Sequence, residues 1–210
     1  AASITIRRSR SSSMTETNSP SRVRAILAVI AVLAVGGLAG SFMLRLAPSA
    51  TDFTMPVVEA DVAQRFPMLA RLSIDDLSAK LASTKPPLLV DVRDDAEFRV
   101  SHIAGAEHID PESTIAAVNA RLAPLAAGRE VVFYCSVGMR SSVIATEVQE
   151  DLVKAGAVGV YNLRGGIFAW HNASRPLVND AGPTNAIHPY NAQWGKLLTR
   201  QDQVRLLLAP

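Results

Sequence analysis

The chain has 210 residues, which is enough for one well-buried domain with extensions but too few for two independent enzymatic domains. Hydrophobic residues make up 49% of the sequence and charged residues 19%, a balance that excludes disorder over the whole chain. The formal net charge of +2 is too small for a nucleic-acid-binding surface, so we expect no nucleic-acid partner.

Residues 1–24 form a polar tail rich in serine and arginine, a composition typical of disordered segments. Residues 25–44 form an uncharged apolar run of 20 residues, enough to cross a bilayer as a helix at about 1.5 Å rise per residue. Arginines are concentrated before this run, so the positive-inside rule places the N-terminus in the cytoplasm. We expect a single-pass membrane anchor, with the rest of the chain on the extracytoplasmic, periplasmic side.

A cleaved signal peptide is the alternative interpretation of the same run, and it would leave the remaining chain secreted. Small residues at Ala47, Ser49 and Ala50 fit a cleavage site. However, the apolar run is longer than the usual core of a signal peptide, and Pro48 occupies the third position before a cut after Ala50, where a small residue is needed. These features favour a retained helix.

Residues 45–71, with three prolines, have the composition of a linker. From residue 72 onward, strand and helix patterns alternate, as they do in a parallel α/β sheet. Strands are predicted over 87–92, 106–109, 130–134 and 158–163. Helices are predicted after the capping residue Ser73, and then over 94–98, 111–126, 141–155 and 166–170. We therefore expect an α/β domain over 72–175 and a C-terminal extension over 176–210 that carries no motif of its own.

Cysteine and histidine usage limits the kinds of site that the chain can hold. Cys135 is the single cysteine, which excludes an internal disulfide and a zinc site built on paired cysteines. The four histidines lack the spacing that places two ligands on one helix face, so we expect no metal site.

Cys135 follows the apolar strand pattern 131–134, and a helix is predicted to begin shortly after it. In open α/β sheets, ligands bind beyond the carboxyl ends of strands, where backbone N–H groups and the positive end of the next helix converge. This position predicts a stabilised thiolate and a nucleophilic cysteine; a small buried core residue is the alternative. Gly138 lets the loop turn tightly, and Arg140 adds a permanent charge that can hold the oxygens of an anionic substrate.

Three stretches of the sequence resemble the signature stretches of single-domain rhodanese-like proteins. They are DVRDDAEFRVSHIAGAEHI (91–109), YCSVGMRSS (134–142) and LRGGIFAW (163–170). The resemblance spans about residues 70–175, so the N-terminal apolar run and the last 35 or so residues lie outside it.

The resemblance implies a doubly wound, five-stranded parallel sheet with helices on both faces, a persulfide on Cys135 and no cofactor. The loop expected to cradle this sulfur consists of Ser136, Val137, Gly138, Met139, Arg140 and Ser141. Asp91 and Arg93 match an Asp-x-Arg element, and we expect them to brace the surrounding loops as an ion pair. Turn or packing roles are expected for the remaining matched residues, which are His102, Gly105, Gly165, Gly166 and Trp170.

The implied function is that of a sulfurtransferase, which moves sulfur from a donor such as thiosulfate to cyanide or a thiol. A membrane-tethered sulfur carrier or binding module with little turnover would have the same loop and is an alternative. A related fold performs phosphatase or arsenate reductase chemistry with five residues between cysteine and arginine, whereas four separate Cys135 from Arg140, which favours sulfur. Outside the cytoplasm, the free thiol would also need a reducing protein partner.

Overall fold

The computed structural model describes residues 53–206. The expected polar tail at 1–24, the expected membrane helix at 25–44 and the first part of the expected linker lie outside the described residues. Between residues 53 and 206, no helix combines the length and the apolar character needed to cross a membrane.

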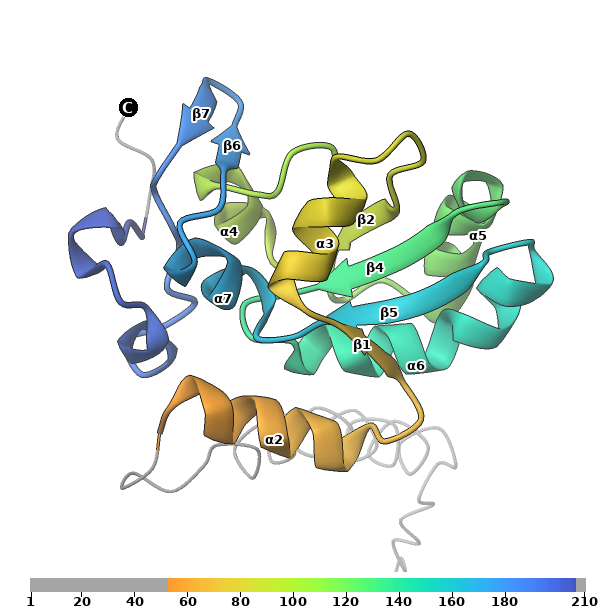
Figure 1. Cartoon of the computed structure of the whole chain (residues 1–210), viewed down its shortest axis with the longest axis horizontal. Coiled ribbons are helices and arrows are strands. Elements are labelled where there is room, and N and C mark those ends of the chain that lie inside the picture. The colour runs from red at the N-terminus through yellow and green to blue at the C-terminus, as the bar shows by residue number, and fades with distance from the viewer. Residues whose placement is uncertain (1–52, 207–210) are drawn as a thin grey trace, which may run out of the picture. The chain divides into compact units, whose positions relative to one another are not determined.

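A five-stranded parallel sheet forms the centre of the described chain (Figure 1). Its strands are β1 (Ala70–Leu72), β2 (Leu88–Asp91), β3 (Glu107–His108), β4 (Glu130–Tyr134) and β5 (Gly159–Leu163). The spatial order is β1-β5-β4-β2-β3, and every neighbouring pair is parallel. The sheet that the resemblance implied is thus confirmed, with β4 at its centre.

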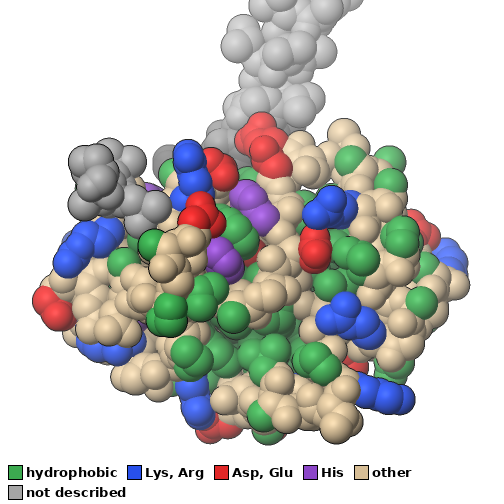
Figure 2. All heavy atoms as spheres, turned by 90° about the horizontal axis from the view of Figure 1, so that it is seen from above, with side chains coloured by type: hydrophobic (Ala, Val, Ile, Leu, Met, Phe, Trp, Pro, Cys, Tyr) green, Lys and Arg blue, Asp and Glu red, His purple; other side chains and the backbone are tan. Residues whose placement is uncertain are grey.

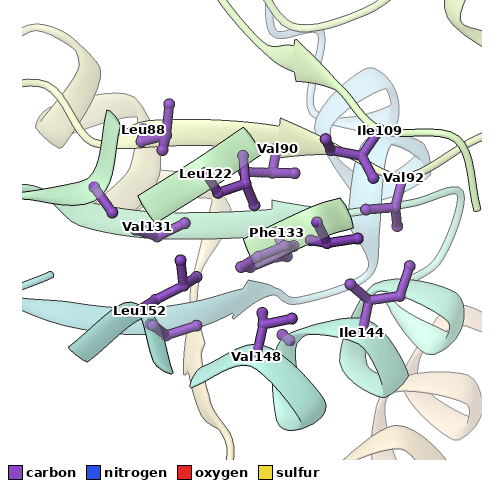
Figure 3. Close-up of a cluster of buried hydrophobic side chains, with 14 of the residues drawn as sticks. Leu88, Val90, Val92, Ile109, Leu122, Val131, Phe133, Ile144, Val148 and Leu152 are labelled. Atoms are coloured by element: carbon purple, nitrogen blue, oxygen red, sulfur yellow. The ribbon is translucent and has the colours of Figure 1, made fainter. Parts of the chain in front are cut away.

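Helices cover both faces of this sheet. They are α2 (Met55–Arg65), α3 (Ile74–Leu81), α4 (Asp95–Val100), α5 (Ile115–Ala126), α6 (Met139–Lys154) and α7 (Gly166–Asn172). On one face, side chains of α5 and α6 such as Leu122 and Val148 pack on Val90 and Phe133 of the central strands (Figure 3). Successive strand residues point to opposite faces, so the buried Leu89 faces the other layer, where Figure 1 shows α3. Burial on both faces explains why these strands read as continuous apolar runs.

Residues 53–71, the described part of the segment expected to be a linker, instead contain α2 and most of β1, so the prediction was wrong there. Pro56 suggested a linker, but it lies in the first turn of α2, where its missing N–H has no helical partner to lose. Val58 and Val62, four residues apart, are the buried residues of this helix. β1 has only three residues and lies at the edge of the sheet, so it carries no apolar run that would predict a strand.

Two helices begin at residues other than those predicted. The helix expected from 111 begins at Ile115, because the Thr114 side chain accepts a hydrogen bond from the N–H of Ala117 and caps it there. The helix expected from 141 begins at Met139, directly after Gly138. This earlier start matters for the site because it places Arg140 in the first turn of α6.

The C-terminal extension folds against the domain. A short antiparallel hairpin, β6 (Leu177–Asn179) with β7 (Gly182–Thr184), is followed by two single turns of 3-10 helix, η1 (Trp194–Leu197) and η2 (Gln201–Gln203). Figure 1 shows this segment at the end of the sheet toward which the β4 arrow points. The extension therefore lies at the edge where an α/β sheet presents its site.

The face of the molecule seen in Figure 2 carries basic and acidic side chains that are interspersed, with histidine and hydrophobic side chains between them. No block of a single charge sign stands out on this face.

Candidate active site

Cys135 directly follows β4 and lies in a tight loop that ends where α6 begins. The loop brings a backbone donor to the sulfur, since the N–H of Gly138 points at Sγ of Cys135 at 3.2 Å. Gly138 adopts a left-handed conformation with φ of +98°. A Cβ here would lie 3.2 Å from the carbonyl oxygen of Leu163 and 3.0 Å from the side chain of Asn162, so both conformation and space favour glycine.

The carbonyl groups of the loop are bound on its outer side. The N–H of Ile167 donates to the carbonyl oxygen of Cys135 at 2.9 Å, and the N–H of Phe168 donates to that of Ser136 at 3.0 Å. Gly166, which precedes these donors in α7, packs so closely that a Cβ would collide with the carbonyl oxygen of Cys135. The start of α7 thus holds the loop in the conformation that turns a backbone N–H toward the sulfur.

Asn162 of β5 fixes the other end of the loop. Its Nδ2 donates to the carbonyl oxygen of Gly138 at 3.0 Å, and its Oδ1 accepts from the hydroxyl of Ser141 at 2.6 Å. The hydroxyl of Ser142 also donates to the carbonyl oxygen of Gly138, at 2.7 Å. These buried groups satisfy one another, which makes the loop a rigid framework for the sulfur.

The expected loop residues 136–141 all meet at this turn, with Val137 and Met139 buried on its apolar side. Cys135 itself is 1% exposed. Across residues 53–206, no group of three or more His, Cys, Asp or Glu side chains is arranged to hold a metal ion.

Arg140 is engaged by acidic groups at the edge of the loop. Its Nη2 lies 2.8 Å from Oε2 and 3.0 Å from Oε1 of Glu97, and its Nη1 lies 3.4 Å from Asp94. The hydroxyl of Ser136 completes the group by donating to Oε1 of Glu97 at 2.8 Å. Because Glu97 is buried beneath it, the Arg140 charge is largely compensated.

Opposite charges shift the pKa values of Glu97 and Arg140 against the effect of burial. Burial alone would raise the pKa of Glu97, but Arg140 and Arg93 outweigh it and hold the pKa below its ordinary value. Burial likewise opposes the charge on Arg140, whereas the negative charges of Cys135 and Glu97 raise the pKa of Arg140. The guanidinium is therefore a fixed cation, paired with Glu97 at the edge of the loop.

Asp91 and Arg93 form a second ion pair, below the loop. Both side chains are fully buried, with 2.7 Å between Nη2 of Arg93 and Oδ2 of Asp91. The same Nη2 donates to the carbonyl oxygen of Ser101 at 2.6 Å, and the guanidinium lies 6.0 Å from the centre of the Tyr134 ring. The pair thus ties the end of β2 to the residue that follows α4, and the bracing role expected from the sequence stays a prediction.

Comparison with known proteins supports the identity of this arrangement. The family model of the rhodanese-like domain matches residues 73–173. Over 115 residues, the chain is 33% identical to a sulfurtransferase of Allochromatium vinosum, and the match covers 55% of this chain and 100% of that protein. The chain belongs to the rhodanese-like family.

Two further relatives carry related names. The thiosulfate sulfurtransferase GlpE of Vibrio cholerae is 30% identical over 107 residues, which cover 50% of this chain and 93% of GlpE. The probable adenylyltransferase/sulfurtransferase MoeZ of Mycobacterium tuberculosis is 35% identical over 119 residues, which cover 57% of this chain but only 29% of MoeZ. These names support a rhodanese-type enzyme.

Three residues at the rhodanese-like loop were missed by sequence reasoning. Glu97 lies within the first of the three stretches that resemble the family. Its acidic side chain was visible in the sequence, but only the fold shows that it pairs with Arg140. Asn162 is a polar residue inside an apolar strand, a pattern that marks a buried hydrogen-bonding role. Tyr190, whose ring lies 4.6 Å from the Arg140 guanidinium, belongs to the extension and had no sequence signal.

Proposed function

We propose that the protein is a sulfurtransferase that moves a sulfane sulfur from a donor such as thiosulfate to cyanide or a thiol through a persulfide on Cys135. The observation that carries this proposal is the position of Cys135: the single cysteine follows the central strand, and a loop N–H points at its sulfur. Family membership supports the same reaction class.

In the first half-reaction, the Cys135 thiolate attacks the outer sulfur of thiosulfate. A new sulfur–sulfur bond forms to Sγ, the original sulfur–sulfur bond breaks, and its electron pair leaves with sulfite. The total charge of minus three is the same on both sides, because the product persulfide carries one negative charge and sulfite carries two. The N–H of Gly138, which lies 3.2 Å from Sγ, is available to stabilise this anion.

In the second half-reaction, the acceptor attacks the outer sulfur of the persulfide. The bond between that sulfur and Sγ breaks, and the electron pair returns to Cys135 as the thiolate. Cyanide becomes thiocyanate, and a thiolate becomes a persulfide. Since donor and acceptor use one site in turn, we expect ping-pong kinetics.

Arg140 serves this chemistry mainly through its charge. Two oxygens of Glu97 already occupy its Nη2, so the expected grip on donor oxygens has to compete with an existing ion pair. Against the effect of burial, a Cys135 thiolate is nevertheless one of the charges that raise the pKa of Arg140. Arg140 thus stays positively charged at the edge of the loop, and direct contact with the donor stays a prediction.

The shortness of the loop supports sulfur transfer over phosphatase or arsenate reductase chemistry. Four residues separate Cys135 from Arg140, and the carbonyl groups of Cys135 and Ser136 are bound by α7. A tetrahedral oxyanion needs a wider ring of N–H donors. We infer that the site takes a single extra sulfur atom.

Mass measurement of the intact protein tests the proposal. Wild-type protein treated with thiosulfate should gain one sulfur, about 32 Da, and lose it to cyanide, whereas Cys135→Ser should gain nothing while keeping its fold. Repeated turnover separates an enzyme from a sulfur carrier or binding module, which would load once and release slowly. Hydrolysis of an aryl phosphate without any sulfur adduct would contradict the proposal.

Membrane attachment is a separate proposal that rests on the sequence. The apolar run 25–44 and the arginines before it support a single-pass anchor with the domain on the periplasmic side, and secretion after signal cleavage is the alternative. A reducing protein partner would then keep Cys135 able to react. Protease added to cells with a permeabilised outer layer should remove a tag placed after Pro210; full protection would contradict this topology, and a mature N-terminus near Thr51 would contradict the retained anchor.

A further inference from the structure

The C-terminal extension reaches the catalytic loop, although it lies beyond the family-matched residues 73–173. Its segment 188–191, which we call the strap, carries Tyr190, and the Tyr190 ring lies 4.6 Å from the Arg140 guanidinium. The strap thus lies beside the edge of the loop that carries Arg140.

Both ends of the strap are fixed. Before it, Ile187 is fully buried; its N–H donates to the carbonyl oxygen of Gln203 at 3.1 Å, and its own carbonyl oxygen accepts from the N–H of Arg205 at 2.9 Å. At its end, Oδ1 of Asn191 accepts from the N–H of Trp194 at 3.0 Å. The position of Tyr190 is therefore set by the fold of the extension.

The conformation of Tyr190 also marks a special position. Its φ of +62° is uncommon for a residue other than glycine, and its N–H donates to Nδ1 of His188 at 3.1 Å. Such a conformation persists only where the surrounding structure holds it. Here it brings the ring over Arg140, where the contact with a cation contributes attraction.

The extension is in turn bound to α7, which holds the catalytic loop. Nδ2 of Asn172 donates to the carbonyl oxygen of Leu197 at 2.8 Å, and Oδ1 of Asn172 accepts from the N–H of Thr199 at 2.9 Å. Nε2 of His171 lies 3.0 Å from Oε1 of Gln203. The strap and the loop therefore share one support.

We propose that Tyr190 is a specificity-determining residue, which narrows the approach to Cys135 so that small sulfur donors and acceptors react and thiols on large molecules are disfavoured. The proposal rests on the function proposed above. Its physical basis is that Cys135 is only 1% exposed while the ring of Tyr190 covers the neighbouring Arg140. Tyr190 itself is 39% exposed, so replacing it opens the site without removing a core side chain.

Size selectivity in alkylation of Cys135 tests the proposal independently of sulfur transfer, because the chain has one cysteine. Iodoacetamide serves as the small probe and its fluorescein conjugate as the large one. In Tyr190→Ala, the rate with the large probe relative to the small probe should rise about tenfold. Tyr190→Phe keeps the ring and should keep the wild-type ratio. Val158→Ala removes an exposed apolar side chain just before β5, at the end of that strand away from Cys135, and it should also keep the wild-type ratio.

Transfer to acceptors of different size supplies the second measurement. Protein loaded with thiosulfate is mixed with 2-mercaptoethanol or glutathione at equal thiolate concentration, and the loss of the added sulfur is followed by mass. Wild type should discriminate against glutathione about tenfold, and Tyr190→Ala should remove most of this discrimination.

The outcomes separate the two proposals. An unchanged alkylation ratio in Tyr190→Ala, or equal rates with both thiols in wild type, would overturn the role of Tyr190. Failure of wild type to acquire sulfur would overturn the proposed function, and the alkylation ratio would still decide whether Tyr190 narrows the approach.

Discussion

Two ion pairs lie near the loop that carries Cys135, and they differ in burial. Asp91 and Arg93, which we call the inner pair, are both fully buried. Glu97 and Arg140, the rim pair, combine a carboxylate that is 1% exposed with a guanidinium that is 14% exposed. Breaking a fully buried pair leaves a charge that no water can reach, whereas the rim cation can still meet solvent and substrate. Breaking the inner pair should therefore be costly to stability, and the rim pair can contribute to chemistry.

The largest effect, on the free energy of unfolding, should come from breaking the inner pair. Arg93→Met leaves the buried Asp91 carboxylate without its partner, and we expect a loss of about 3–5 kcal/mol in the free energy of unfolding. Urea denaturation measures it. Arg99→Met is the matched control, because Arg99 pairs with Asp95 on the surface and its loss should change little. Small and similar losses of unfolding free energy in the two variants would contradict the distinction between the inner pair and the rim pair.

Removing the rim cation should affect the reaction as well as the fold, because the buried Glu97 carboxylate loses its main partner. In Arg140→Ala, the attraction for anionic donors and for the thiolate is lost, so we expect the thiosulfate KM to rise about tenfold. Cys135 should still be alkylated, since the N–H of Gly138 is retained. Arg121→Ala, which removes an arginine from a surface pair with Glu107, is the control. Unchanged donor dependence in folded Arg140→Ala would assign Arg140 to structure.

Removing only the rim anion should have the opposite, smaller effect. Glu97→Gln keeps the side-chain shape but frees Arg140 from a full opposite charge, so we expect the thiosulfate KM to fall about threefold. Steady-state kinetics at low salt measures the change, with Glu130→Gln, in the pair with Lys80, as control. A higher KM in Glu97→Gln would mean that Glu97 positions Arg140 for the donor.

The pH dependence of stability gives the smallest effect. The pKa of Glu97 is lowered in the folded protein from its ordinary 4.5, so its contribution is fully present above about pH 4.5 and is lost as the pH falls through the folded pKa. The stability difference between wild type and Glu97→Gln should therefore shrink below pH 4.5. Burial and the neighbouring Glu97 raise the pKa of Asp94, so the comparison reports on these two carboxyl groups together. A difference that stays constant down to pH 3 would contradict this prediction.

The sequence was most informative where a pattern has a local cause. The strand before Cys135, the glycine that permits a turn and the helix after it are close in the chain, and together they locate the Cys135 loop. β1 escaped prediction because three residues at a sheet edge need no apolar run, and Leu72 is its one buried residue. Its pairing with β5 connects residues far apart in the chain.

Partners of the loop were harder to foresee than the loop itself. Glu97 and Arg140 are separated by 42 intervening residues, and their ion pair exists only because α4 and α6 begin at the same end of the sheet. Tyr190 depends on a chain of turns and side-chain hydrogen bonds in the extension, where no repeating pattern marks the fold. Sequence periodicity reports regular elements, and these contacts depend on tertiary structure.

The two outer strands of the sheet have a consequence for association between molecules. β1 has three residues and β3 has two, so each edge offers few backbone groups to a strand from another chain. Glu107 on β3 also carries a charge that is paired with Arg121. Short and charged edges oppose the strand-to-strand contacts that begin aggregation. The longer strands β4 and β5, which are the ones that could template such contacts, are shielded inside the sheet.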